Sequence, residues 1–97
     1  MGKVPAIKHD DDVVTECAAI CAYLAETFPE AELAPKDHER ADYYRWLFFA
    51  AGPLEQAITD KSLGLTPNEE QERSAGYGNY EKAVAALEGA VSGRDYI

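Results

Sequence analysis

The pattern of hydrophobic and polar residues predicts a short β-hairpin at the start of the chain. A β-prone run at positions 3–8 is followed by a polar stretch at 9–12 and then by Val13 and Val14. Two β-prone runs around an Asp-rich turn are typical of a hairpin. Pro5 has no backbone N–H to give to a sheet, so we expect the first strand to lie at an edge or at a bulge.

Hydrophobic residues then recur at spacings of three and four, which predicts amphipathic helices. The first helix is expected to take Thr15 as its N-cap, to carry Glu16 in its first turn and to end at Pro29. Its apolar face is formed by Cys17, Ile20, Cys21, Leu24 and Phe28.

A loop and a second helix follow. Residues 30–35 are expected to form the loop, with Leu33 anchored against the body of the protein. The second helix should begin near Asp37, which is a good capping residue. Gly52 and Pro53 interrupt its pattern, and an interior proline is expected to kink the helix there.

A third helix is predicted from position 66 onward. Residues 66–69 combine a capping box with Pro67 at the first helical position. Gly76 and Gly78 weaken the middle of this helix, and Gly93 is a natural residue for its C-terminal end. The predicted fold class is therefore mainly α, with a short N-terminal β-hairpin followed by three amphipathic helices.

Size and charge limit the functions that this chain can have. Its 97 residues form one domain at most. The formal charge of −9 opposes binding to the phosphate groups of nucleic acids and to anionic lipid. No apolar run approaches the roughly 20 residues that a membrane span needs, and the first residues do not form a secretory signal. We therefore expect no nucleic-acid or membrane partner and a cytoplasmic location.

The two cysteines suggest packing rather than a disulfide. Cys17 and Cys21 are four residues apart, a spacing that suits a helix face and is poor for a disulfide. We expect both to be small core residues, and a redox thiol at Cys17 is the alternative because a helix start lowers a thiol pKa. His9 and the aspartates at 10–12 read as a polar turn, so no metal site is predicted.

Several segments together resemble the soluble glutathione transferases. The family pattern "GKVPAL … ES-AI-YLA" is matched by three segments: Gly2-Lys3-Val4-Pro5-Ala6-Ile7, Thr15-Glu16-Cys17-Ala18-Ala19-Ile20 and Tyr23-Leu24-Ala25. The similarity continues through Phe28-Pro29, Leu33, Pro35, the helix at 40–47 and the stretch from Leu87 to Ile97. The resemblance implies that residues 1–29 are the C-terminal part of a thioredoxin-like domain. Residues 30–36 would be the linker, and residues 37–97 the N-terminal part of the all-helical domain.

The resemblance also implies a glutathione site. Val4 matches the residue whose backbone pairs with the cysteinyl unit of glutathione, and Pro5 matches the cis-proline after it. Glu16 and Cys17 match the acidic–serine pair that holds the γ-glutamyl end. A helix N-terminus suits a carboxylate, since it offers free N–H groups and a positive dipole. The chain has Cys17 where the family has serine, and a thiol is a weaker donor than a hydroxyl.

The implied activity is conjugation or thiol exchange of glutathione with small electrophiles. The family's catalytic residue lies on the strand–helix unit that precedes this segment. We therefore expect a glutathione transferase-like fragment that has no catalytic residue of its own, little activity as an isolated chain, and glutathione as its small-molecule ligand. The aromatic residues that either line an electrophile pocket or serve as core and interface are Tyr43, Tyr44, Trp46, Phe48 and Phe49.

The alternative is a non-catalytic, oligomerising helical module derived from the same family. In family members the helices that match residues 16–28 and 40–58 pack across a two-fold interface. We therefore expect a homodimer or a larger homo-oligomer.

Overall fold

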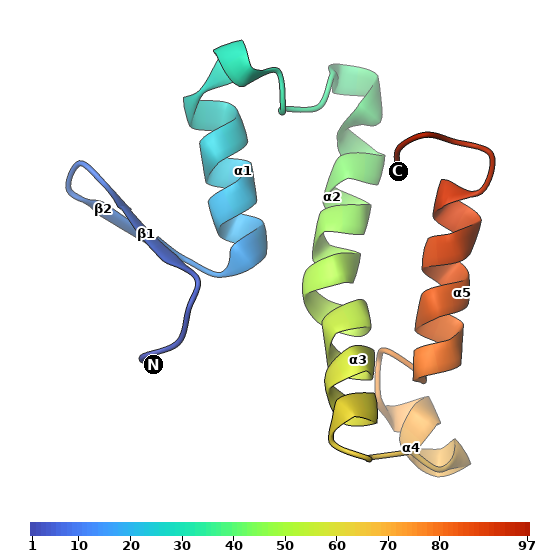
Figure 1. Ribbon diagram of the computed structural model, residues 1–97. Coiled ribbons are helices and arrows are strands. Elements are labelled where there is room, and N and C mark those ends of the chain that lie inside the picture. The colour runs from blue at the N-terminus through green and yellow to red at the C-terminus, as the bar shows by residue number, and fades with distance from the viewer. The chain divides into compact units, whose positions relative to one another are not determined.

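The computed structural model describes residues 1–97 and is mainly helical, with 60% helix and 8% strand (Figure 1). The predicted fold class, a mainly α chain that begins with a β-hairpin, is confirmed. None of the helices combines the length and the apolar character that crossing a bilayer requires. The chain forms two compact units, residues 1–47 and residues 48–97. The linker predicted at residues 30–36 from the family resemblance separates two domains of that family. The division into compact units does not test it, so it stays a prediction.

The first unit begins with the hairpin. Strands β1 (Ala6–His9) and β2 (Asp12–Thr15) pair in antiparallel fashion. Asp10 turns the chain with a φ of 52°, a left-handed conformation that aspartate tolerates better than most residues. Pro5 lies just before β1, so its missing N–H leaves no gap in the ladder of hydrogen bonds.

Helix α1 (Cys17–Thr27) packs on this hairpin. Its buried residues are Ala18, Ile20 and Ala25. A polar contact adds to the packing, because Nδ1 of His9 lies 2.8 Å from the hydroxyl of Tyr23. The hairpin and the helix are thus joined by both apolar and polar contacts.

Two expectations about α1 are wrong. The N-cap residue is Glu16 and not Thr15, which belongs to β2 and continues the hairpin up to the helix. Cys17 and Cys21 are exposed rather than packed in a core. Burial on α1 is confined to other positions, among them Ala25, which lies one turn after Cys21. The prediction that Pro29 ends the helix is confirmed.

The segment after α1 contains two short 3₁₀ turns, η1 (Pro29–Ala31) and η2 (Asp37–Glu39). Leu33 between them is 69% exposed, so the expected anchor is wrong. The turn η2 leads into α2 (Arg40–Phe49). The second helical segment therefore begins at the predicted place, but Lys36 takes the N-cap position in place of Asp37.

The cap at Lys36 is made by its backbone. The N–H of Lys36 donates to Oε2 of Glu39 at 3.0 Å, which satisfies a donor at the start of the helix. Asp37 forms an ion pair instead of a cap, with its Oδ1 3.1 Å from Nη2 of Arg40.

The second unit begins at Phe48, and Pro53 lies near its start. The predicted interruption at Gly52 and Pro53 takes the form of a π-helical turn, η3 (Ala50–Leu54), which is followed by α3 (Glu55–Ser62). The N–H of Glu55 bonds to the carbonyl of Ala50, five residues back. A wider turn accommodates a residue that has no N–H and whose ring collides with the carbonyl four residues before it.

The predicted third helix is two helices, α4 (Glu69–Ser74) and α5 (Tyr80–Val91). Each has its own N-cap: Asn68, and not Thr66, caps α4, and Asn79 caps α5. Gly93 ends the segment with a φ of 72°, as predicted.

The core of the second unit consists of small side chains. Helix α5 packs against α3 and η3, and the buried residues are Ala57, Ala83 and Ala90. Small side chains at such positions let helices lie close together, but they contribute little buried apolar area.

Candidate functional site

The residues predicted to bind glutathione lie at one end of the hairpin. Ala6 at the start of β1 pairs with Thr15 at the end of β2. Val4 and Pro5 directly precede the first of these residues, and Glu16 and Cys17 directly follow the second. The antiparallel register therefore brings together two pairs of neighbouring residues that are 11 or more positions apart in the sequence.

The first part of this site is an open backbone edge. Val4 is 92% exposed, and the hydrogen bonds of the hairpin begin only at Ala6. The Val4–Pro5 peptide bond is cis, as the resemblance implies. An exposed backbone outside a sheet ladder can pair with an extended peptide, which supplies the missing N–H and C=O partners.

The second part is the N-terminus of α1. The first intrahelical bond runs from the N–H of Ile20 to the carbonyl of Glu16 at 2.9 Å, so the N–H groups of residues 17–19 have no partner within the helix. No side chain caps this end, and the first turn carries no acidic residue. Unpaired N–H groups and the positive end of the dipole make it a suitable place for an anionic group.

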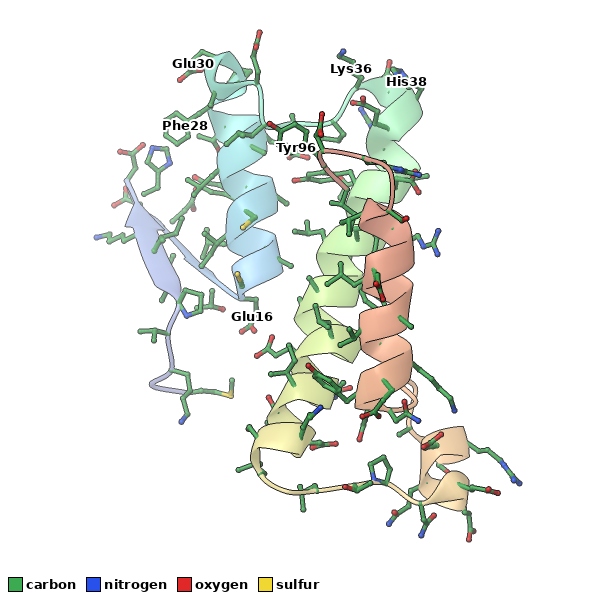
Figure 2. All side chains as sticks on the ribbon, turned by 45° about the vertical axis from the view of Figure 1, so that its right-hand side comes forward. Glu16, Phe28, Glu30, Lys36, His38 and Tyr96 are labelled. Atoms are coloured by element: carbon green, nitrogen blue, oxygen red, sulfur yellow. The ribbon has the colours of Figure 1, made fainter.

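Glu16 has an unusual backbone conformation, with φ at 69° and ψ at 121°. Such values are costly for a residue with a side chain and occur mostly where the surroundings enforce them, often at ligand sites. Its carboxylate accepts a hydrogen bond of 3.3 Å from the hydroxyl of Thr15. Figure 2 labels Glu16 at the junction of the hairpin with α1, where its carboxylate points away from the helix.

Cys17 occupies the first position of α1 and is exposed together with Cys21, one turn later. The pKa of the Cys21 thiol is raised, mainly by partial desolvation and further by the charge and the hydrogen bond of Cys17. The expected packing role of both residues is thus replaced by a pair of accessible, neighbouring thiols.

The aromatic residues of α2 make local contacts. The rings of Tyr43 and Tyr44 meet edge to face with centroids 5.2 Å apart, and the guanidinium of Arg45 lies 4.7 Å from the ring of Trp46. The pKa of Tyr43 is raised by partial desolvation and then by neighbouring ionisable groups, of which Tyr44 contributes most. Whether this group serves an electrophile pocket stays a prediction.

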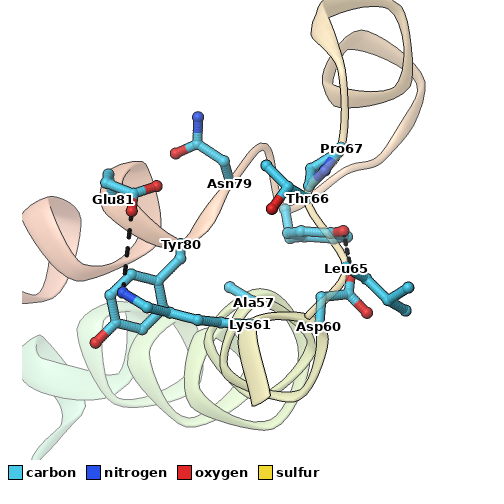
Figure 3. A pocket seen from close by; sticks show the side chains of 10 residues that line it. Ala57, Asp60, Lys61, Leu65, Thr66, Pro67, Asn79, Tyr80 and Glu81 are labelled. Carbon is cyan, nitrogen blue, oxygen red and sulfur yellow. Dashed lines mark hydrogen bonds and ion pairs between the residues drawn. The ribbon is translucent and has the colours of Figure 1, made fainter. Parts of the chain in front are cut away.

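A different pocket, of about 130 Å³, lies in the second unit (Figure 3). Tyr77 donates a hydrogen bond from its hydroxyl to Asp60, and this bond, with desolvation and nearby carboxylate charge, raises the pKa of Tyr77. The ammonium of Lys61 lies 3.5 Å from the ring centroid of Tyr80 and 4.0 Å from Oε1 of Glu81. The protein's own lysine thus takes the position that a cationic ligand would prefer.

Sequence reasoning missed this pocket for a specific reason. It forms where the chain breaks between α4 and α5 and folds back on α3, whereas the sequence pattern predicts one continuous helix there. The local signals of the break are Gly76 and Gly78, which weaken a helix, and Asn79, which can cap a helix that starts at the next residue. No group of three or more His, Cys, Asp or Glu side chains is arranged to hold a metal ion.

Comparisons with known proteins find similarity in the N-terminal part of the chain. Residues 1–32 match the family model of the glutathione S-transferase N-terminal domain. The chain is 48% identical over 48 residues to protein LigF of Sphingobium sp. strain SYK-6, and the aligned segment covers 46% of this chain and 19% of LigF. It is 46% identical over 46 residues to glutathione S-transferase Z1 of Arabidopsis thaliana, and this aligned segment covers 46% of the chain and 21% of that relative. No solved structure matches.

These matches support a relationship of residues 1–32 to the thioredoxin-like N-terminal domain of glutathione transferases. The chain is related to the glutathione transferase superfamily through this partial segment. The matched segments span about a fifth of the length of the curated relatives.

Proposed function

We propose that the chain is part of a glutathione transferase-like protein and binds glutathione at the end of the hairpin. One observation carries the proposal. The uncapped N-terminus of α1, with Glu16 in its left-handed conformation, lies at the same end of the hairpin as the open backbone edge of Val4. These two features offer matching partners to the charged and the peptide parts of a γ-glutamyl tripeptide.

Each residue has a distinct part in this binding. The free N–H groups at positions 17 and 18 donate hydrogen bonds to the γ-glutamyl carboxylate, and the carboxylate of Glu16 pairs with the γ-glutamyl ammonium. The backbone of Val4 pairs with the cysteinyl unit as an added strand, and Pro5 sets the direction of the chain there. These contacts hold the ligand and leave its thiol free.

The activity proposed for the whole protein is conjugation or thiol exchange of glutathione with small electrophiles. This chemistry requires a group that lowers the pKa of the glutathione thiol. None of the four residues of the site has that role in the proposal, because they hold the γ-glutamyl end and the backbone of the tripeptide. The proposed contribution of this chain is therefore binding and orientation, in a cytoplasmic setting.

Isothermal titration of glutathione into the 97-residue chain tests the binding. Glu16→Gln should weaken binding about tenfold, since a hydrogen bond to a charged group contributes about 1.5–3 kcal/mol. Glu26→Gln, at an exposed glutamate near the other end of α1, is the matched control and should change nothing. Equal losses in the two variants, or no binding of glutathione at millimolar concentration, would contradict the proposal.

Two further titrations separate this site from non-specific binding. S-methylglutathione should bind as well as glutathione, because the contacts do not include the thiol, whereas cysteinylglycine should not bind. Cys17→Ser should strengthen binding severalfold, since a hydroxyl is a better donor to a carboxylate than a thiol. A serine variant that binds more weakly would exclude Cys17 from the site.

The second candidate function is self-association of the helical segment. The buried residues of the second unit are three alanines, whereas Ile58, Leu63 and Leu65 are 49%, 67% and 57% exposed. Exposed apolar side chains around a small core favour pairing with a second copy. Sedimentation equilibrium over a wide concentration range should show a dimer or larger species that Ile58→Lys weakens. A monomer at every concentration would rule this function out.

A further inference from the structure

Two accessible thiols lie side by side on α1. Cys17 and Cys21 are both free and exposed, and they lie one helical turn apart on α1. Residues four apart on a helix share one face, with Cβ atoms about 5–6 Å apart. A disulfide needs Cβ atoms about 3.5–4.5 Å apart, so this pair is too wide to close into one while the helix is intact.

The spacing suits a metal ion placed between the two sulfur atoms. Metal–thiolate bonds of about 2.3 Å give a linear S–metal–S unit about 4.6 Å long, which side chains on neighbouring helical turns can span. Zinc requires four ligands, and no third His, Cys, Asp or Glu side chain is grouped with this pair. Among common ions, thiolates select the soft Cu(I), which is satisfied by two of them.

The charge around the pair also favours a cation. The chain carries a formal charge of −9, which attracts a positive ion. A bound Cu(I) replaces the two thiol protons, so two S–Cu bonds form, two protons leave to solvent and no electron is transferred.

We propose that Cys17 and Cys21 form a two-thiolate site for Cu(I) on the exposed face of α1. The proposal goes beyond glutathione binding and does not depend on it. The two sites share Cys17, so occupation by the metal and by the γ-glutamyl carboxylate exclude each other.

The test is an anaerobic titration of the reduced 97-residue chain with the acetonitrile complex of Cu(I), in competition with a chromophoric Cu(I) chelator. Native mass spectrometry should show one copper ion on each single chain. Cys17→Ser and Cys21→Ser should each weaken binding about a hundredfold, because the second bond of a chelate forms at high effective concentration.

A register variant serves as the matched control. In Cys21→Ala/Ala22→Cys the chain keeps two thiols, but the second lies five residues from the first and so on another face of the helix. This variant should bind as weakly as the single serine variants, with its helicity checked by circular dichroism. Full affinity in the register variant or in Cys21→Ser, or a copper ion shared between two chains, would overturn the proposal.

Glutathione titrations keep the two proposals apart. Cys21→Ser should lose Cu(I) and keep its affinity for glutathione, whereas Glu16→Gln should lose glutathione and keep Cu(I). Failure of only one of these ligands to bind the natural chain would therefore remove one proposal and leave the other.

Discussion

The ammonium of Lys82 lies 2.6 Å from Oε2 of Glu72 and ties α5 to α4 across the break between the two helices. Asn79 adds a second tie, since its Nδ2 donates to Oε1 of the same glutamate at 2.7 Å. Asn79 also caps α5 by accepting a hydrogen bond from the N–H of Lys82 at 2.9 Å. A single carboxylate thus fixes the start of α5 against the preceding helix.

Replacing Lys82 tests this arrangement. The pKa of Glu72 is lowered by the hydrogen bond from Asn79 first and by Lys82 second. A lowered folded-state pKa gives stability that is present above the unfolded pKa and is lost as pH falls through the folded pKa. Lys82→Met should therefore raise the pKa of Glu72 and reduce the acid dependence of stability below about pH 4.5, the ordinary value.

Carbon-detected NMR titration of the Glu72 carboxyl checks the shift. Lys36→Met, which changes a lysine of the first unit, is the control and should leave the pKa of Glu72 unchanged. An unchanged value in Lys82→Met would mean that the ion pair does not persist in solution.

Element boundaries that depend on turns and prolines could be predicted from the sequence, whereas the boundary between α4 and α5 could not. The hairpin, the end of α1 at Pro29 and the break at Pro53 follow from local rules and were predicted, although β1 begins at Ala6 and not at position 3. The split between α4 and α5 was missed because the apolar spacing continues through Gly76 and Gly78 as if the helix did. Asn79 and Lys82 hold Glu72 across the break, and the apolar spacing of the sequence does not show these contacts.

In the candidate site, too, some features could be predicted from the sequence and others could not. The four residues were predicted from a resemblance, and the hairpin register places them at one end. The left-handed conformation of Glu16 could not be predicted, because glutamate has no local preference for it and the surrounding chain imposes it. The exposure of Cys17 and Cys21 was missed since three-four spacing shows that residues share a face and not what covers that face.

A pair of glycine substitutions tests the break between α4 and α5. Gly78 has a φ of +71°, and a Cβ there would lie 3.4 Å from Cδ of Lys82. Gly78→Ala should lower the free energy of unfolding by about 1 kcal/mol, the usual penalty for a side chain in this conformation. Gly89 lies within α5 with open space around it, so Gly89→Ala should raise that free energy by about 0.5–1 kcal/mol.

Urea denaturation followed by circular dichroism measures both variants. Opposite signs for two identical substitutions would separate backbone conformation from general effects of an added methyl group. Stabilisation by Gly78→Ala would show that α4 and α5 join into one helix in solution.

The contact between Tyr77 and Asp60 gives a prediction about ionisation. The pKa of Tyr77 is raised, first by its hydrogen bond to Asp60. Asp60→Asn keeps a hydrogen-bond acceptor but removes the charge that opposes the phenolate, so the pKa of Tyr77 should fall. Absorbance titration near the phenolate band follows this change. Asp42→Asn, in the first unit, should have no such effect, and equal titration curves for the two variants would contradict the contact.

The last prediction concerns the conflict between stability and binding at Glu16. Its φ of 69° is costly for any residue with a Cβ, and glycine adopts it freely. Glu16→Gly should therefore raise the free energy of unfolding by about 1 kcal/mol while it weakens glutathione binding. Glu16→Ala removes the same carboxylate and keeps the unfavourable backbone, so it should lose the same affinity without gaining stability. Urea denaturation and glutathione titration of both variants decide the matter. Equal stability of the two would show that the backbone at this position relaxes in solution, and full affinity in both would show that the γ-glutamyl ammonium binds elsewhere.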